Sequence, residues 1–177
     1  MDQAVFTSWH DFYVTMGTSS ASLIGLLFVA LSINADAING SSRDDLRAFA
    51  EQAFASFSTV LLIAVVFLIP SGGPGSTGIA YIGFGVLGGA RMVRRAPAIW
   101  RSMRQGRLGE SMFWRFVLPA AALAGLVAAG VGLLVGEPSA LYWLVWVIIS
   151  LLVSAARSSW DLLVRVSEDR RAAASGG

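Results

Sequence analysis

The sequence predicts an all-α protein: a bundle of five transmembrane helices that forms a single membrane domain over residues 1–177. Composition is the first observation, because 55% of the residues are hydrophobic and only 14% are charged, which is too apolar for an ordinary soluble domain. Charge placement is the second. Five long apolar runs alternate with short connections, and five crossings put all 13 arginines on one side of the membrane. Since basic residues in short loops stay in the cytoplasm, we expect the amino terminus outside and the carboxyl terminus inside.

The spans are predicted from run length and from the residues that interrupt the runs. A helix needs about 20 apolar residues to cross roughly 30 Å of hydrocarbon. We expect the first span at residues 12–33, with aromatic rings at its outer end, where the headgroup level favours them. The second is expected at residues 48–69, where Pro70 and a glycine-rich stretch end it. The fourth and fifth are expected at residues 112–135 and 140–156.

The third span, at residues 77–93, is short and rich in glycine, so a re-entrant segment is the alternative. We retain the crossing because its removal would divide the arginines between the two sides of the membrane. Residues 94–110 are then a basic cytoplasmic loop. Residues 157–177 are a cytoplasmic tail that we expect to continue the last helix, because opposite charges recur there every four residues.

Small and hydroxylated residues inside the spans predict close helix packing. Lipid tails are as apolar as leucine, so membrane helices associate through close backbone approach and interhelical hydrogen bonds. The predicted packing positions are Gly17, Ala21, Gly25, Gly85, Gly89 and Gly125. A row of hydroxyl groups, from Thr15, Ser19 and Ser22, borders the first of these sets. This row is explained either by the same packing or by a hydrated path along the first helix.

Glu51 is the acidic residue that lies inside a predicted hydrophobic helix. A charge at the bilayer centre costs about 2.5–3.5 kcal/mol on insertion scales, so such a carboxylate is a functional hypothesis by default. Arg47, four residues earlier, is within side-chain reach and favours an ion pair at the inner interface. The functional alternative is a proton or cation site that Glu51 forms with Ser32 and Asn34.

The basic loop predicts contact with lipid. Arg94, Trp100, Arg101 and Arg104 suit the headgroups of an anionic inner leaflet, which attract a nearby basic residue by about 1 kcal/mol. A docking surface for another protein is the alternative. Because contact with lipid and cytoplasm accounts for the basic charge, we expect no nucleic-acid partner.

Motifs of enzymes and metal sites are missing from the sequence. There is no HExxH, no Gly-x-Ser-x-Gly and no P-loop, and His10 is the single histidine. One histidine beside Asp11 is too little for a metal centre. We therefore expect no catalytic residues, no metal and no cofactor. Cysteine is absent, which excludes disulfides.

Residues 9–13 (W-H-D-F-Y) and 25–34 (G-L-L-F-V-A-L-S-I-N) carry a resemblance to a family of small bacterial integral-membrane proteins common in actinobacteria. It covers roughly the first seventy residues, and the later spans are similar only in hydropathy. The family is uncharacterised, and some members are labelled modulators of a membrane-bound AAA+ protease. The resemblance implies a shared membrane fold in the bacterial cytoplasmic membrane, with Asn34 and Glu51 as the positions most worth testing.

Two functions from different classes follow from the sequence. The preferred one is a non-catalytic bundle of structural or regulatory role, which acts through contacts with lipid, with a second copy or with another membrane protein. The alternative is an oligomeric channel or transporter for a small ion or solute, whose polar path runs along the first helix toward Glu51. A single chain of five helices without inverted repeats is small for a transporter with a midplane site.

Overall fold

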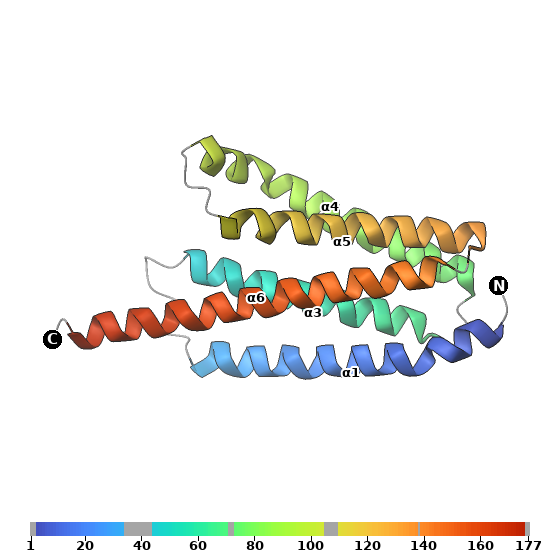
Figure 1. The fold of residues 1–177 in the computed structure, drawn as a ribbon, viewed down its shortest axis with the longest axis horizontal. Coiled ribbons are helices and arrows are strands. Elements are labelled where there is room, and N and C mark those ends of the chain that lie inside the picture. The colour runs from blue at the N-terminus through green and yellow to red at the C-terminus, as the bar shows by residue number, and fades with distance from the viewer. Residues whose placement is uncertain (1–2, 34–43, 71–72, 105–109, 138, 176–177) are drawn as a thin grey trace.

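The computed structural model describes residues 3–33, 44–70, 73–104, 110–137 and 139–175. The regular structure of these residues is helical throughout, which confirms the all-α prediction for the described part of the chain. Its five helices run along a common long axis (Figure 1). They are α1 (Gln3–Ile33), α3 (Asp44–Phe67), α4 (Pro74–Arg104), α5 (Glu110–Val135) and α6 (Ala140–Ser175).

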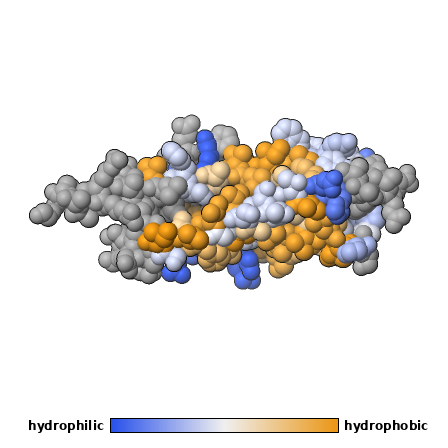
Figure 2. Space-filling view, turned by 90° about the horizontal axis from the view of Figure 1, so that it is seen from below, coloured by the Kyte–Doolittle hydropathy of each residue, from blue (hydrophilic) through white to orange (hydrophobic). Residues whose placement is uncertain are grey.

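Four of the described helices contain stretches long and apolar enough to cross a membrane. These stretches are Trp9–Ile33 in α1, Phe49–Phe67 in α3, Val117–Val135 in α5 and Ala140–Asp161 in α6. Hydrophobic side chains also dominate the outer surface over the middle of the molecule (Figure 2). An apolar surface of this extent marks contact with a membrane or a partner. The chain therefore has the character of a helical membrane protein.

The helices extend beyond the predicted spans. α1 begins at Gln3, α4 continues to Arg104, and α6 continues to Ser175, as expected for the tail. The predicted loop at residues 94–110 is thus helical as far as Arg104, while residues 105–109 lie outside the described part of the chain. Apolarity marks where a membrane ends, but alanine, arginine and methionine remain good helix formers beyond it. Pro97 lies inside α4, where it removes one backbone hydrogen-bond donor from the helix.

Local sequence ends the helices at the two tight connections. At the end of α3, Leu68 N donates to both Ala64 O (3.1 Å) and Val65 O (3.2 Å), and Ile69 N makes a 3₁₀-type bond to Val66 O at 3.4 Å. Pro74 occupies the first position of α4, where its missing N–H is not needed. After α5, Gly136 adopts a left-handed conformation with φ of 83°. Glu137 N then donates to Gly132 O at 2.9 Å, which closes a Schellman motif. Both connections make consecutive helices run antiparallel.

In space the helices follow the order α1, α3, α6, α5, α4, and each packs mainly on the next. α6 therefore lies between α3 and α5, although it is last in the sequence (Figure 1). α1 and α4 lie at the two edges. α4 also touches α3 near their shared turn, where the Tyr81 hydroxyl donates to the Ile63 carbonyl at 3.0 Å.

The core consists of two clusters of buried apolar side chains. The larger cluster joins all five helices of the described chain, and within it the ring of Tyr13 stacks on Phe67 with centroids 3.9 Å apart. The smaller cluster includes Leu27, Phe57 and Ala155, so it joins α1, α3 and α6. Since lipid also solvates apolar groups, we attribute the stability of both clusters to close packing and not to burial from water.

The helices α4 and α5 approach each other closely where they cross at Gly78 and Gly130. A Cβ atom added to Gly78 would lie 2.7 Å from the Gly130 carbonyl oxygen, and one added to Gly130 would lie 2.7 Å from the Gly78 carbonyl oxygen. A side chain at either position would force the two backbones apart, so glycine allows the observed crossing.

Candidate functional site

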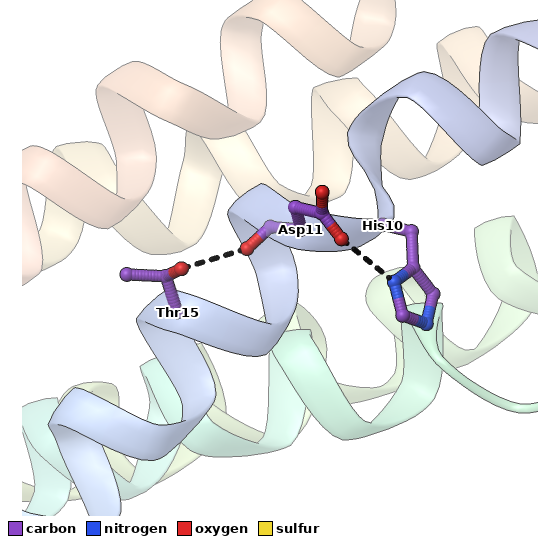
Figure 3. A network of polar contacts seen from close by, with 3 residues as sticks. All are labelled: His10, Asp11 and Thr15. Atoms are coloured by element: carbon purple, nitrogen blue, oxygen red, sulfur yellow. Dashed lines mark hydrogen bonds and ion pairs between the residues drawn. The ribbon is translucent and has the colours of Figure 1, made fainter.

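A short polar network lies near the amino-terminal end of α1 (Figure 3). The Thr15 hydroxyl donates to the Asp11 backbone carbonyl at 2.8 Å, and the imidazole Nδ1 of His10 lies 3.2 Å from the Asp11 carboxylate. The side chains of His10 and Asp11 are both exposed, Asp11 completely. Within the described residues, no group of three or more His, Cys, Asp or Glu side chains could hold a metal ion.

The predicted hydroxyl row lies on the outward face of α1. Thr15, Ser19 and Ser22 are all exposed on the surface of the chain. Thr15 and Ser22 each bond back to a carbonyl of their own helix, at 2.8 Å to Asp11 and at 3.0 Å to Thr18. These local bonds satisfy hydroxyl groups without a neighbouring helix. The row therefore borders no path through the interior of a single chain.

The three predicted packing positions of α1 fall on different faces. Gly17 is buried against α3, where an added Cβ would lie 3.1 Å from the Ala64 Cβ. Ala21 and Gly25 are exposed, and no described residue outside the helix has an atom within 4 Å of a Cβ added to Gly25. Of this set, only Gly17 lies at a helix contact within the described chain.

Of the other predicted packing glycines, two lie at contacts between helices and one does not. A Cβ added to Gly85 would lie 2.5 Å from Val127 Cγ2 in α5, and one added to Gly125 would lie 2.8 Å from Val147 Cγ2 in α6. Gly85 and Gly125 therefore lie at helix contacts. A Cβ added to Gly89 would meet no described atom within 4 Å.

The hydroxyl groups that are buried differ from those of the predicted row. Ser20 is fully buried and lies opposite the exposed row, and neither its hydroxyl nor that of Tyr13 has a hydrogen-bond partner among the described residues. Other buried polar side chains are Ser56, Thr77, Ser154 and Ser158. A helical wheel anchored on Tyr13 would have separated Ser20 from Ser22, because seven residues return to nearly the same face at about 100° per residue.

Glu51 lies near the edge of the apolar stretch of α3 and not at its middle. The stretch begins at Phe49, so Glu51 is about 3 Å inside it at 1.5 Å per residue. Its carboxylate accepts a hydrogen bond from Arg47 Nε at 3.3 Å, and both side chains are substantially exposed. This position and partner match the ion-pair interpretation. Ser32 is exposed, and Asn34 lies outside the described residues.

Glu51 and the hydroxyl row lie on different sides of the molecule. Phe54, one turn from Glu51, packs on Phe28 of α1 with ring centroids 5.7 Å apart. Ser22 and Phe28 are six residues apart, so they point about 120° away from each other around α1. Within one chain, the row does not lead to Glu51.

The basic part of α4 carries the predicted headgroup contacts. Arg94 is exposed, as is Arg91 one turn before it. Trp100, Arg101 and Arg104 belong to the backbone of α4, but their side chains lie outside the described part of the structure.

Comparisons with models of protein families, with curated proteins and with solved structures find no match to this chain. The resemblance of the first seventy residues to a bacterial membrane family therefore stays a prediction. The local geometry described above carries the functional argument.

Proposed function

We propose that the protein is a non-catalytic, multi-pass component of the bacterial cytoplasmic membrane, with a structural or regulatory role exerted through lipid and helix–helix contacts. One observation carries this proposal. The polar groups expected to handle a solute, the hydroxyl row and the Arg47–Glu51 pair, face outward from the single chain instead of lining its interior. Outward polar and small groups in a membrane are suited to contact with another helix.

The proposed topology has five crossings, with α4 as the third and the amino terminus outside. In support, the ends of α1, α4 and α6 and the starts of α3 and α5 lie together at one end of the bundle, on the left in Figure 1. Arg47 lies in the first turn of α3, and Arg91 and Arg94 lie in the second half of α4, so all three belong to the helix halves nearer that end. α4 has 31 residues, so at 1.5 Å per residue it is long enough to cross hydrocarbon roughly 30 Å thick.

Labelling of introduced cysteines tests this orientation, because the chain has none of its own. In intact cells, a membrane-impermeant maleimide should react with Glu137→Cys and not with Arg101→Cys. Permeabilised cells should label both variants. Equal labelling of the two in intact cells would show that the orientation is wrong.

Anionic lipid of the inner leaflet is the proposed partner at the arginine-rich end. Arg91 and Arg94 are exposed there on consecutive turns of α4, and Trp160 of α6 is also exposed. Indole rings and guanidinium groups suit the headgroup region. Replacing both arginines with glutamine should reduce the amount of phosphatidylglycerol that stays bound to the protein during detergent purification. The amount of bound phosphatidylethanolamine, a zwitterionic lipid, should stay unchanged.

An oligomeric conduit for a small ion or solute is the second candidate, and the exposed hydroxyls of α1 favour it over a conduit inside one chain. Several copies would have to place these hydroxyls around a common axis. Ion flux into liposomes separates the two candidates, with Ser19→Leu and Glu51→Gln compared with the parent and with Val153→Leu as an outward control. Flux that depends on Ser19 or Glu51 would overturn the proposed structural or regulatory role in favour of a conduit. Equal background flux in all four proteins would support the structural or regulatory role.

A further inference from the structure

The exposed tyrosine and tryptophan side chains of the described structure all lie on α6. They are Tyr142, Trp143, Trp146 and Trp160, and each is 65% to 68% exposed. On the other helices, the described side chains of these two types are fully or partly buried: Tyr13 and Tyr81 completely, and Trp9 in part. Tyrosine and tryptophan have an apolar body and a polar tip, so they favour the boundary between an apolar and a wet environment.

These aromatic rings belong to the outward side of α6. The helix packs on α3 and on α5, and the side chains that it turns toward the bundle, such as Leu144 and Ile148, are buried (Figure 1). The exposed residues are spaced alternately by four and three positions, as expected for one face of a helix. We call this the α6 face, and it comprises Tyr142, Trp146, Ile149, Val153, Ala156 and Trp160.

The aromatic residues lie at the two ends of the α6 face, close to one membrane thickness apart. Tyr142 and Trp160 are separated by about five helical turns, so they point in the same direction at levels about 27 Å apart. The hydrocarbon core of a bilayer is roughly 30 Å thick. Leu151 is midway between the two residues and also lies near the middle of the apolar stretch Ala140–Asp161. The two ends of the face therefore match the two headgroup levels of one bilayer.

The centre of the α6 face is aliphatic. Ile149 and Val153 are exposed there, and they have neither the hydroxyl group nor the small side chain through which membrane helices associate. The contact between α4 and α5 shows the difference, because Gly78 and Gly130 form it. A helix packed on the α6 face would also give no reason for amphipathic rings at two levels separated by a bilayer. Acyl chains and headgroups account for both features.

Charge distinguishes the two ends of α6. Arg157 is exposed about one turn before Trp160, and its long side chain can extend along the helix to place the guanidinium group at the headgroup level. Residues 140–156 of the same helix contain no charged side chain. Because anionic lipid of the inner leaflet attracts basic residues, this charge agrees with the orientation proposed above.

We propose that bilayer lipid covers the α6 face along its whole length, with Tyr142 at the headgroup level of the outer leaflet and Trp160 at that of the inner leaflet. Acyl chains then contact Ile149 and Val153, and the aromatic rings fix the depth of the helix. This inference rests on the proposed function, in which the protein acts through lipid and helix contacts. It names the face that lipid, and not a protein partner, occupies.

Spin labels on introduced cysteines test the proposal in vesicles of phosphatidylethanolamine and phosphatidylglycerol, because the chain has no cysteine of its own. Oxygen dissolves in hydrocarbon and relaxes a label that faces acyl chains, whereas a nickel chelate stays in water. Labels on Ile149→Cys and Val153→Cys should be relaxed by oxygen and not by nickel. Ser154→Cys is the matched control, since Ser154 lies at nearly the same depth but is buried, so both effects should be lost there.

The same labels test the depth of the two ends. Tyr142→Cys and Trp160→Cys should give equal ratios of oxygen to nickel relaxation, because both residues are equally far from Leu151. Both ratios should be lower than those at Ile149→Cys and Val153→Cys. A ratio for Trp160→Cys as high as that for Val153→Cys would place Trp160 among the acyl chains and overturn the assigned levels.

Two results at the centre of the face would overturn the proposal. If the label on Val153→Cys is as protected from oxygen as the label on Ser154→Cys, a second copy of the chain covers the face. If nickel relaxes the label on Val153→Cys, water reaches the face. Neither result measures flux that depends on Ser19 or Glu51, so this inference and the proposed structural or regulatory role fail separately.

Photocrosslinking extends the test to other proteins of the native membrane. A benzophenone attached to Val153→Cys should react with lipid on illumination and give no discrete protein band larger than the chain itself. A discrete larger band would show that a protein covers the α6 face and would overturn the proposal.

Discussion

The contact between Gly78 and Gly130 makes a quantitative prediction about stability. Ordinary contacts of a Cβ atom begin at 3.4 Å, whereas a Cβ added to Gly78 would lie 2.7 Å from a backbone oxygen of α5. Gly78→Ala must therefore push the two helices apart by about 0.7 Å at their crossing. Overpacking of this kind costs about 1–3 kcal/mol. Alanine regains up to about 1 kcal/mol of helix propensity over glycine, so the net loss should be about 1 kcal/mol.

A second alanine substitution in the same helix isolates the packing contribution. Gly83→Ala gains the same propensity, but a Cβ there meets no described atom within 4 Å. Reversible unfolding in mixed micelles, with a rising fraction of sodium dodecyl sulfate and helicity followed by circular dichroism, measures both variants. We expect Gly83→Ala to be about 1–3 kcal/mol more stable than Gly78→Ala. Equal stabilities would refute the assigned crossing of α4 and α5.

Two further predictions use the same unfolding assay. Tyr81→Phe should lower the free energy of unfolding by about 0.6–1.7 kcal/mol, because it removes the hydrogen bond to the Ile63 carbonyl. Tyr13→Phe should leave the free energy of unfolding unchanged, because the buried hydroxyl of Tyr13 has no hydrogen-bond partner among the described residues. Similar losses in both variants would contradict this assignment. A double-mutant cycle between Arg47 and Glu51 should give a coupling below about 1 kcal/mol that weakens with salt, as for exposed ion pairs. A salt-independent coupling of several kcal/mol would instead indicate a buried pair.

Hydropathy and helix-breaking residues predicted the existence of the described helices well, and the positions of their ends less well. Residues such as Pro70 and Gly136 interrupt the backbone pattern itself, so they identify the turns from sequence alone. The end of α4 was not predicted, because the sequence loses its apolar character several turns before the helix stops, whereas the recurring opposite charges predicted that α6 continues into the tail. Four helices meet the requirements of a membrane span, and α4 falls short because glycine and arginine lower its hydropathy.

The inward and outward faces of each helix could not be predicted from residue type. A soluble helix shows its buried face by an apolar stripe, but lipid is as apolar as a protein interior and removes that signal. Gly17 and Gly25 have the same spacing to Ala21, yet only Gly17 packs on another helix within the described chain. Likewise, Ser20 is buried while Ser19 and Ser22 are exposed. A helical wheel separates Ser20 from Ser22, but the positions of α3 and α6 around α1 decide which of the two faces is buried.

The central place of α6 has a consequence for biogenesis. When the ribosome has released α1 through α5, α3 has its contact with α1 and α5 its contact with α4, but the helix that packs against both α3 and α5 has not yet been made. The nascent chain then consists of two packed helix pairs, α1 with α3 and α4 with α5, and the contacts between the pairs are mainly the few between α3 and α4. Translation of α6 completes the tertiary structure, so a chain truncated before Ala140 should be recognised and degraded by membrane quality control.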